Sequence, residues 1–218
     1  MNQEEFIIEA KNLIKRSILK DNLIIFFTRV LEDLKKNENS CLFGRIKDLY
    51  YLINPYQDST KKEIYSFFKN DFGCNEGLIL DDEEKLFCNV LFSNLREDFI
   101  LINGKVMKGR ILGIIKRLIL KYFPNSSDIV EPFIFAKLIC SVGGVDRLIQ
   151  LPSSTIQLIG AEKALFRHKS KKTNSPKYGL LYLSRKIQES SNKGKAARQI
   201  SNKLFISIKL DYYQIIAQ

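Results

Sequence analysis

Residues 154 to 168 read Ser-Thr-Ile-Gln-Leu-Ile-Gly-Ala-Glu-Lys-Ala-Leu-Phe-Arg-His. Ser154 and Gln157 have the spacing of a capping box, in which two side chains satisfy free backbone amides of the first helical turn. The sequence therefore predicts that a helix begins here. Its apolar residues can face a core, while its cations gather near the C-terminal end, where the helix dipole favours them. The apolar set is Ile156, Ile159, Ala164 and Leu165, and the basic set is Lys163, Arg167, His168 and Lys169. An ordinary amphipathic helix with a solvated basic end would show the same pattern.

The charge of the chain is concentrated in its last third. Thirteen of the 35 Lys and Arg residues, but only three of the 24 Asp and Glu residues, lie between Leu151 and Gln218. This segment therefore carries +10 of the net charge of +11. A one-signed segment of this size is typical of proteins that bind phosphates. A membrane surface would attract the same charge, but the segment lacks the Trp-rich or Phe-rich face that inserts into lipid. We therefore expect a nucleic acid partner.

Composition excludes several classes of protein. At 218 residues and 45% hydrophobic content, the chain can bury a core and form one large or two small domains. Its longest apolar runs, such as Leu23 to Phe27, fall far short of the roughly 20 residues that span a bilayer. The N-terminal residues include three glutamates, which is wrong for a signal or transit peptide. The four cysteines are scattered, which argues against a zinc ribbon or a disulfide framework and favours thiols in a reducing compartment.

The sequence offers little for catalysis. His168 is the sole histidine, so there is no His-based metal cluster, and a catalytic triad would have to recruit this one Lys-flanked residue. No Gly-rich phosphate loop occurs. The acidic run from Asp81 to Glu84 can chelate a cation in principle, but adjacent acids at a helix start usually serve the helix dipole. We expect no enzyme activity, no metal and no cofactor.

Apolar spacing and capping signals predict an all-α chain. Helices are predicted from Asp21 and from Leu42, from Thr60 with Glu63 as a capping box, from near Asp82, and from Ser127 or Asp128 up to Gly143 and Gly144. Asn103-Gly104 is a hairpin signal, and we expect it to form a turn between two antiparallel helices. An amphipathic helix is also predicted before Asp21, and it must bury its apolar face against a partner or the rest of the chain.

The last segment contains two loops and a long helix. Leu180 to Leu183 is expected to form a short strand. A helix follows from about Lys195 to Tyr213, on which Lys195, Arg198 and Asn202 share one face. Such a stripe can meet a phosphate backbone.

Several motifs of the chain resemble the Nop-domain family, and specifically the archaeal box C/D ribonucleoprotein scaffold. The resemblance covers roughly residues 10 to 213 and is carried mainly by Gly160 to Arg167, Pro176 to Gly179 and Gly194 to Arg198. It implies an all-α protein in which a helical coiled-coil dimerisation domain, residues 1–142, is followed by a compact helical Nop domain, residues 143–218, that binds RNA and a partner protein.

The resemblance also implies a function. Family members bind a kink-turn RNA only together with a small kink-turn-binding protein, and they support guide-directed RNA 2′-O-methylation by fibrillarin. Carried over by position, Gly160 to Lys163 would contact the RNA and the partner, and Ala164 to Arg167 would lie against the guide duplex. The expected RNA-binding residues are Glu162, Lys163, Phe166, Arg167, His168, Lys177, Lys195, Arg198 and Lys203, and the expected partner-binding residues are Gln157, Gly160 and Ala161. Phe166 can stack on an exposed base pair or belong to a core.

The chain also departs from the family pattern. Family members begin with an α/β domain that binds fibrillarin, whereas the first residues here resemble the entry to the coiled coil. We therefore expect fibrillarin to bind through a separate N-terminal-domain protein. The arm between Asp82 and Tyr122 is shorter than the family's dimerisation arm. The chain can therefore form a homodimer or remain a monomer. Phe205 replaces a small residue and Lys209 replaces an arginine. The basic repetitive tail of eukaryotic members is missing, which favours an archaeal, cytoplasmic protein. A eukaryotic protein of this family would be nucleolar.

The alternative function is structured-RNA binding in a splicing-like ribonucleoprotein without methylation.

Overall fold

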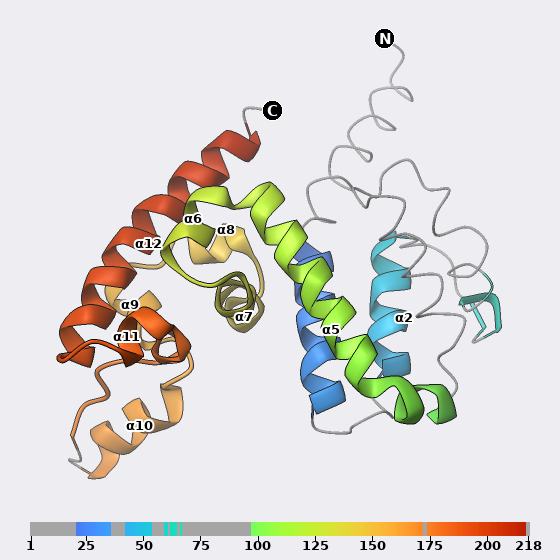
Figure 1. Cartoon of the computed structure of the whole chain (residues 1–218), viewed down its shortest axis with the longest axis horizontal. Coiled ribbons are helices and arrows are strands. Elements are labelled where there is room, and N and C mark those ends of the chain that lie inside the picture. The colour runs from blue at the N-terminus through green and yellow to red at the C-terminus, as the bar shows by residue number, and fades with distance from the viewer. Residues whose placement is uncertain are drawn as a thin grey trace. The chain divides into compact units, whose positions relative to one another are not determined.

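The computed structural model describes residues 21–35, 42–53, 59–60, 62–64, 66, 97–171 and 174–216. The chain divides into two compact units, Met1–Ile114 and Ile115–Gln218, and each is described by itself. Every regular element in the described ranges is helical, which confirms the all-α prediction (Figure 1). The helices expected before Asp21 and near Asp82, with the acids from Asp81 to Glu84, lie outside the described residues.

The first unit contains the helix over residues 21–35, helix α2 (Leu42–Ile53) and the first part of helix α5 (Glu97–Tyr122). Arg45 of α2 donates a hydrogen bond from Nε to Asp33 Oδ2 at 3.2 Å, which joins α2 to the helix before it. The helices predicted from Asp21 and from Leu42 are confirmed, and their apolar positions are buried. These positions include Leu23, Phe27, Val30, Leu31 and Leu34 on the first helix, and Ile46 and Leu49 on α2.

The capping box at Thr60 is also confirmed, whereas the expected turn at Asn103-Gly104 is wrong. The Thr60 amide donates to Glu63 Oε2 at 2.7 Å, and the Glu63 amide donates to Thr60 Oγ1 at 3.5 Å. Helix α5 runs without a break through Asn103 and Gly104. A single glycine costs a helix only about 1 kcal/mol, and the long apolar series that follows outweighs that cost.

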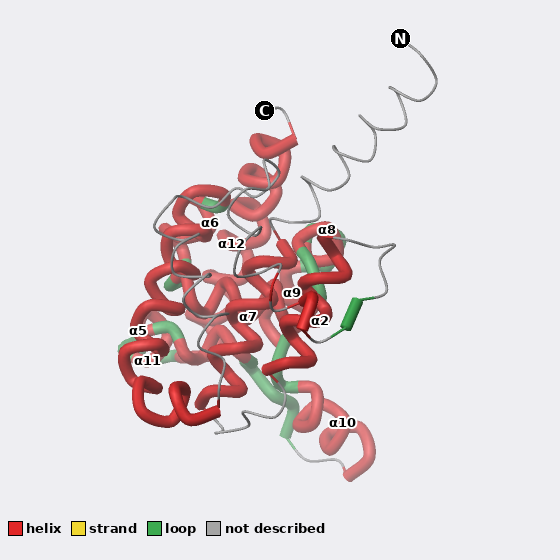
Figure 2. Tube along the Cα trace, turned by 90° about the vertical axis from the view of Figure 1, so that its right-hand side faces the viewer, coloured by secondary structure: helices red, strands yellow, loops and turns green. Residues whose placement is uncertain are grey.

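The second unit begins within α5 and is built around its last helix. The helices after α5 are α6 (Pro124–Ile129), α7 (Pro132–Val142), α8 (Val145–Leu148), α9 (Ser153–Leu158), α10 (Glu162–Lys171), the 3₁₀ helix η3 (Leu180–Leu183), α11 (Arg185–Gln188) and α12 (Lys193–Ile216). Helix α12 packs along α6 and α9, and α10 projects at the end opposite to the C-terminus (Figures 1 and 2). The predicted C-terminal helix is thereby confirmed, and it is a few residues longer than expected.

A proline and a glycine set the bounds of helix α7. Pro132 is the first residue of α7, so this helix begins after Glu131 and not at Ser127 or Asp128 as expected, both of which lie inside α6. Proline favours the first helical position because its missing amide would be unpaired there. Gly143 ends α7 with a φ of 88°, as its position in the sequence predicts.

The expected strand at Leu180 to Leu183 is a 3₁₀ helix. The Tyr182 amide donates to the Gly179 carbonyl at 3.0 Å, and the Ser184 amide donates to the Leu181 carbonyl at 3.0 Å. The side chain of Leu181 is fully buried. The apolar run thus inserts one leucine into the core, and the amides of Tyr182 and Ser184 are satisfied locally, where a strand would need a neighbouring strand.

Asp211 of α12 binds the start of α6, 85 or 86 residues earlier in the chain. Its Oδ1 accepts hydrogen bonds from the Asn125 amide at 3.0 Å and from Asn125 Nδ2 at 2.8 Å. Its Oδ2 accepts from the Ser126 amide at 2.8 Å and from Ser126 Oγ at 2.6 Å. The Asp211 side chain is fully buried. This carboxylate caps the N-terminus of α6, where free amides and the helix dipole favour a negative charge.

A second set of contacts joins the end of α6 to α11. Lys186 donates from Nζ to the carbonyls of Asp128 at 2.7 Å and Ile129 at 2.9 Å, and Glu131 Oε1 accepts from the Arg185 amide at 3.0 Å. Partial burial acts to raise the pKa of Glu131. Backbone hydrogen bonds, the Ser184 hydroxyl and the charge of Lys186 outweigh this effect, so that the pKa lies below its ordinary value. Lys186 is therefore a structural cation of the basic segment.

Substituting Asp211 by alanine should destabilise the protein by roughly 3 kcal/mol or more, because the buried donors of Ser126 and the half-buried donors of Asn125 lose a charged acceptor. Urea unfolding of both proteins measures this loss. The control is Asp146→Ala, which removes an exposed acid of α8 and should cost about 0.5 kcal/mol. An equal loss for both variants would show that the Asp211 cap contributes nothing of its own.

Glu131 should give the protein an acid-sensitive share of its stability. Because its folded pKa is lowered, this share is present above its unfolded pKa of about 4.5 and is lost as pH falls through the folded value. The unfolding free energy of Glu131→Gln should therefore fall less than that of the parent protein between about pH 5 and pH 3. Glu189→Gln, at an exposed position, should keep the parental slope. Parallel slopes for the parent and Glu131→Gln would contradict this role.

Candidate functional site

The segment from Ser153 to Lys171 forms two helices and not one. Gly160 adopts a φ of +86° between α9 and α10, a conformation that favours glycine. The expected capping box of Ser154 and Gln157 is also wrong, because α9 begins at Ser153 with Pro152 before it and no side-chain cap. Gln157 instead donates from Nε2 to the Lys177 carbonyl at 2.5 Å. Gln157 therefore binds a backbone carbonyl 20 residues later in the chain and does not cap the helix.

The segment from Lys177 to Leu180 docks on the end of α9, backbone against backbone. The Gly179 amide donates to the Gln157 carbonyl at 2.9 Å, and the Leu180 amide donates to the Ile159 carbonyl at 2.7 Å. A Cβ atom on Gly179 would collide with the Ile159 carbonyl oxygen, and one on Gly160 would stand 2.6 Å from Leu180 Cγ. Both positions therefore require glycine.

Helix α10 projects from this corner with most of its surface in solvent. None of its residues is buried, so Ala164 and Leu165, expected to face a core, are only half-buried. Phe166 is 68% exposed, which rules out the core alternative for its ring. Lys163 and Arg167 are exposed and His168 is half-buried.

Glu162 holds the corner that leads into α10. Its Oε1 accepts a hydrogen bond from the Gly160 amide at 2.7 Å, which places the carboxylate on the turn between the helices. Ala161, the residue between them, is half-buried. The one acid of the expected RNA-binding set is thus bound to the backbone of the turn.

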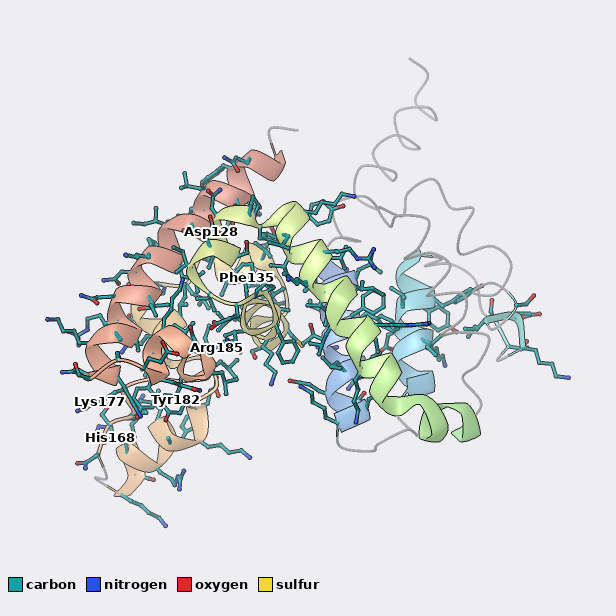
Figure 3. The ribbon with its side chains drawn as sticks, in the orientation of Figure 1. Asp128, Phe135, His168, Lys177, Tyr182 and Arg185 are labelled. Carbon is teal, nitrogen blue, oxygen red and sulfur yellow. The ribbon has the colours of Figure 1, made fainter. Side chains whose placement is uncertain are left out.

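Lys177 connects this corner to the first turn of α12. A Cβ atom on Gly194 would lie 3.2 Å from Lys177 Cδ, so the lysine stem runs along that turn. The Lys195 amide donates to Asn192 Oδ1 at 3.1 Å, which caps α12. In Figure 3 the labelled side chains of His168, Lys177 and Tyr182 gather at this end of the unit.

Two tyrosines and a lysine that the sequence analysis missed complete this end. The rings of Tyr178 and Tyr182 stack at 4.7 Å between centroids and 14° between planes. Lys193 Nζ lies 5.4 Å from the Tyr182 ring centroid and 3.4 Å from its hydroxyl. The spacing of four residues between the tyrosines was visible, but a helical period was not expected in this segment. The pair fixes the docked segment against the start of α12.

The structure joins part of the expected site at this corner, while Lys163, Phe166, Arg167 and His168 lie on the projecting helix α10. Gln157, Gly160, Glu162 and Lys177 meet at the corner, and Lys195 follows on the adjoining helix. Arg198 lies on the same exposed face of α12 as Lys195. Lys203 lies eight residues beyond Lys195, about 12 Å along the helix axis, and is therefore separate from this cluster.

The exposed cations of this surface are free of carboxylates. Among the residues that the structure describes, none of the following forms a salt bridge: Lys163, Arg167, Lys177, Lys195, Arg198 and Lys203. Unpaired cations on a rigid surface suit phosphate groups. Within the described ranges no group of His, Cys, Asp and Glu is arranged to hold a metal ion. No described helix is long and apolar enough to cross a membrane.

Substituting Gly179 by alanine should cost roughly 3 kcal/mol or more of stability, because the new methyl group meets a carbonyl that cannot move without breaking the docked backbone. Thermal unfolding measures the loss. Gly113→Ala is the matched control, since a Cβ atom there has open space on helix α5 and should stabilise by about 0.5 to 1 kcal/mol. A neutral Gly179→Ala would disprove the close approach.

Comparison with known proteins relates this surface to one family. The sequence model described as "Nop: snoRNA binding domain, fibrillarin" matches residues 96–217. The chain is 30% identical over 218 residues to an uncharacterised NOP5 family protein of Methanocaldococcus jannaschii, covering 88% of this chain and 52% of that protein. It is 44% identical over 90 residues to nucleolar protein 58 of Dictyostelium discoideum, covering 40% of this chain and 14% of that protein. Nucleolar protein 56 of Saccharomyces cerevisiae is 42% identical over 92 residues, 41% of this chain and 18% of the relative.

A solved structure of a fibrillarin/Nop5p complex contains a similar chain. Its TM-score is 0.49 at 22% identity, with coverage of 94% of this chain and 66% of the other.

The chain spans at most about half the length of the curated relatives described above. The Nop sequence model, however, matches more than half of the chain and includes α12 and the whole corner at Gly160. The chain therefore belongs to the Nop family.

Proposed function

We propose that the chain is a non-catalytic scaffold of a box C/D guide ribonucleoprotein, which binds kink-turn RNA together with a small kink-turn-binding protein and supports 2′-O-methylation of RNA. One observation carries the proposal: the region matched by a snoRNA-binding family model carries a surface of exposed cations without carboxylate partners among the described residues. The names of the relatives favour this role over a splicing-like one, because they denote nucleolar and NOP5 proteins.

The proposed RNA contacts lie on α10, on the first half of α12 and at Lys177 of the docked segment between them. Arg167 and Arg198 can bind phosphate through a bidentate fork, while Lys163, Lys177 and Lys195 supply mobile charges. Phe166 offers an exposed ring for stacking on a base. His168 follows Arg167 on α10, and Glu162 shapes the turn that leads into that helix. Lys203 is a separate proposed contact farther along α12.

The proposed partner-protein contacts lie at the corner between α9 and α10. Gly160 is exposed and Ala161 is half-buried, so both can be reached by another protein. Gln157 donates from Nε2 to the Lys177 carbonyl, which leaves Oε1 as the atom for an outside contact. Because the same corner fixes Lys177, binding of the partner protein and of RNA should depend on each other.

The remaining assignments are part of the same proposal. A dimerisation domain over residues 1–142 and an RNA-binding domain over residues 143–218 stay predictions, as does a homodimer. Association with fibrillarin, directly or through a separate protein, is proposed because the description of the matching family names fibrillarin. A nucleolar location is proposed for a eukaryotic source, following the eukaryotic relatives, and a cytoplasmic one for an archaeal source.

Substituting Arg167 or Arg198 by alanine should weaken assembly on kink-turn RNA by roughly 1 to 3 kcal/mol, because each loses a charge-assisted hydrogen bond to phosphate. Titration of the RNA, preloaded with a kink-turn-binding protein, measures this change. Circular dichroism should show folded proteins, since both side chains are exposed.

The control variant is Lys62→Ala, which removes an exposed cation of the first unit. It should leave assembly within the error of the titration. If Lys62→Ala weakens assembly as much as Arg167→Ala does, the loss reflects net charge and the site assignment fails.

A further inference from the structure

The exposed face of α12 changes character along its length. In the first half it carries Lys195, Arg198 and Asn202. In the second half the same face carries Ile206, Leu210 and Tyr213, which are 58%, 52% and 65% exposed. These three residues are spaced four and three apart, so they form one stripe along the helix. We call them the apolar stripe.

The apolar stripe lines a shallow, open depression along α12. The depression, of about 400 Å³, is lined by the three stripe residues together with Phe205, Lys209 and Gln214. Lys209 Nζ lies 4.2 Å from the centroid of the Phe205 ring, so the lysine stem extends the apolar wall and its charge marks the rim. The opposite face of α12 is occupied, since Leu204, Ile208 and Asp211 are fully buried.

The charges around the stripe have a single sign. Lys203 and Lys209 flank it on its two sides, and Asp211, the one acid of α12, is buried and hydrogen-bonded to Asn125 and Ser126. A complementary partner therefore presents apolar side chains between carboxylates. The three anchors span about 10 Å along the axis, which corresponds to two turns of a facing helix.

These observations favour one occupant over two others. Ile206 and Leu210 have neither a flat ring nor a hydrogen-bonding group for a nucleotide, and Tyr213 alone among the three stripe residues can stack on a base, so the stripe favours a protein over RNA. Symmetric pairing of two copies through the stripe would bring Lys203 and Lys209 of one copy against the same lysines of the other, and like charges oppose this. We propose that the apolar stripe is a docking site for an acidic amphipathic helix of a partner protein.

The test uses two designed peptides and the full chain. The first peptide, of about 18 residues, places leucines on one face of a helix and glutamates beside them. The second carries lysines in place of the glutamates. Fluorescence anisotropy of labelled peptide measures binding, and the first peptide should bind at least about tenfold more tightly than the second.

Three variants locate the site. Leu210→Gln should weaken binding of the acidic peptide about tenfold or more, because it removes the central anchor. Lys209→Glu should weaken it and should improve binding of the basic peptide. Leu183→Gln is the matched control, since Leu183 is 47% exposed on η3 and should leave binding unchanged. All three positions are exposed or half-buried, and thermal unfolding verifies that the variants fold.

Four results of the peptide and light-scattering experiments would overturn the proposal. They are equal binding of both peptides, no binding of the acidic peptide, an effect of Leu183→Gln as large as that of Leu210→Gln, and a parent dimer that Leu210→Gln converts to a monomer in light scattering. Assembly on kink-turn RNA should be unchanged by Leu210→Gln, and a loss there would assign the stripe to RNA. Because the RNA assay and the peptide assay use different residues of α12, this proposal and the proposed function can fail independently.

Discussion

The buried carboxylate of Asp211 joins the two ends of the second unit. It caps α6 through the amides of Asn125 and Ser126, so the last helix of the chain is fixed to the residues that directly follow α5. A charged group can be buried at this point because four donors replace its water shell and the helix dipole favours it. With Asp211 fixed, the rotation of α12 about its axis is set, which decides which side chains are buried and which meet solvent.

A second constraint acts at the other end of α12, where two backbones touch. Gly179 lies against the Ile159 carbonyl and Gly160 lies against the Leu180 side chain, so neither position leaves room for a Cβ atom between α9 and the docked segment. This contact positions Lys177 beside Gly194 and lets the tyrosine pair close over the start of α12. The cations of three separate segments thereby come to one end of the unit. Their arrangement is thus the product of glycine contacts as much as of the basic residues themselves.

Periodicity predicted the helices well, whereas local signals failed where a distant contact competed with them. Leu23, Ile46 and their apolar neighbours were placed correctly because burial repeats with the helical period. Asn103-Gly104, Ser154 with Gln157, and Leu180 to Leu183 were misread. In each case a longer helix or a tertiary hydrogen bond outweighed a two-residue or four-residue signal. The exposure of the basic residues could be predicted from their charge alone. The stacking of Tyr178 on Tyr182 could not, because it depends on how residues 176–183 fold.

The rigidity of α12 relates its two exposed halves to each other. Lys195 and Leu210 lie on one continuous helix, 15 residues and therefore about 22 Å apart along the axis. Both ends of that helix are fixed, by Asp211 at one end and by Asn192 and Lys177 at the other. A protein helix bound at the apolar stripe would consequently be held at a set distance and rotation from an RNA bound at Lys195 and Arg198.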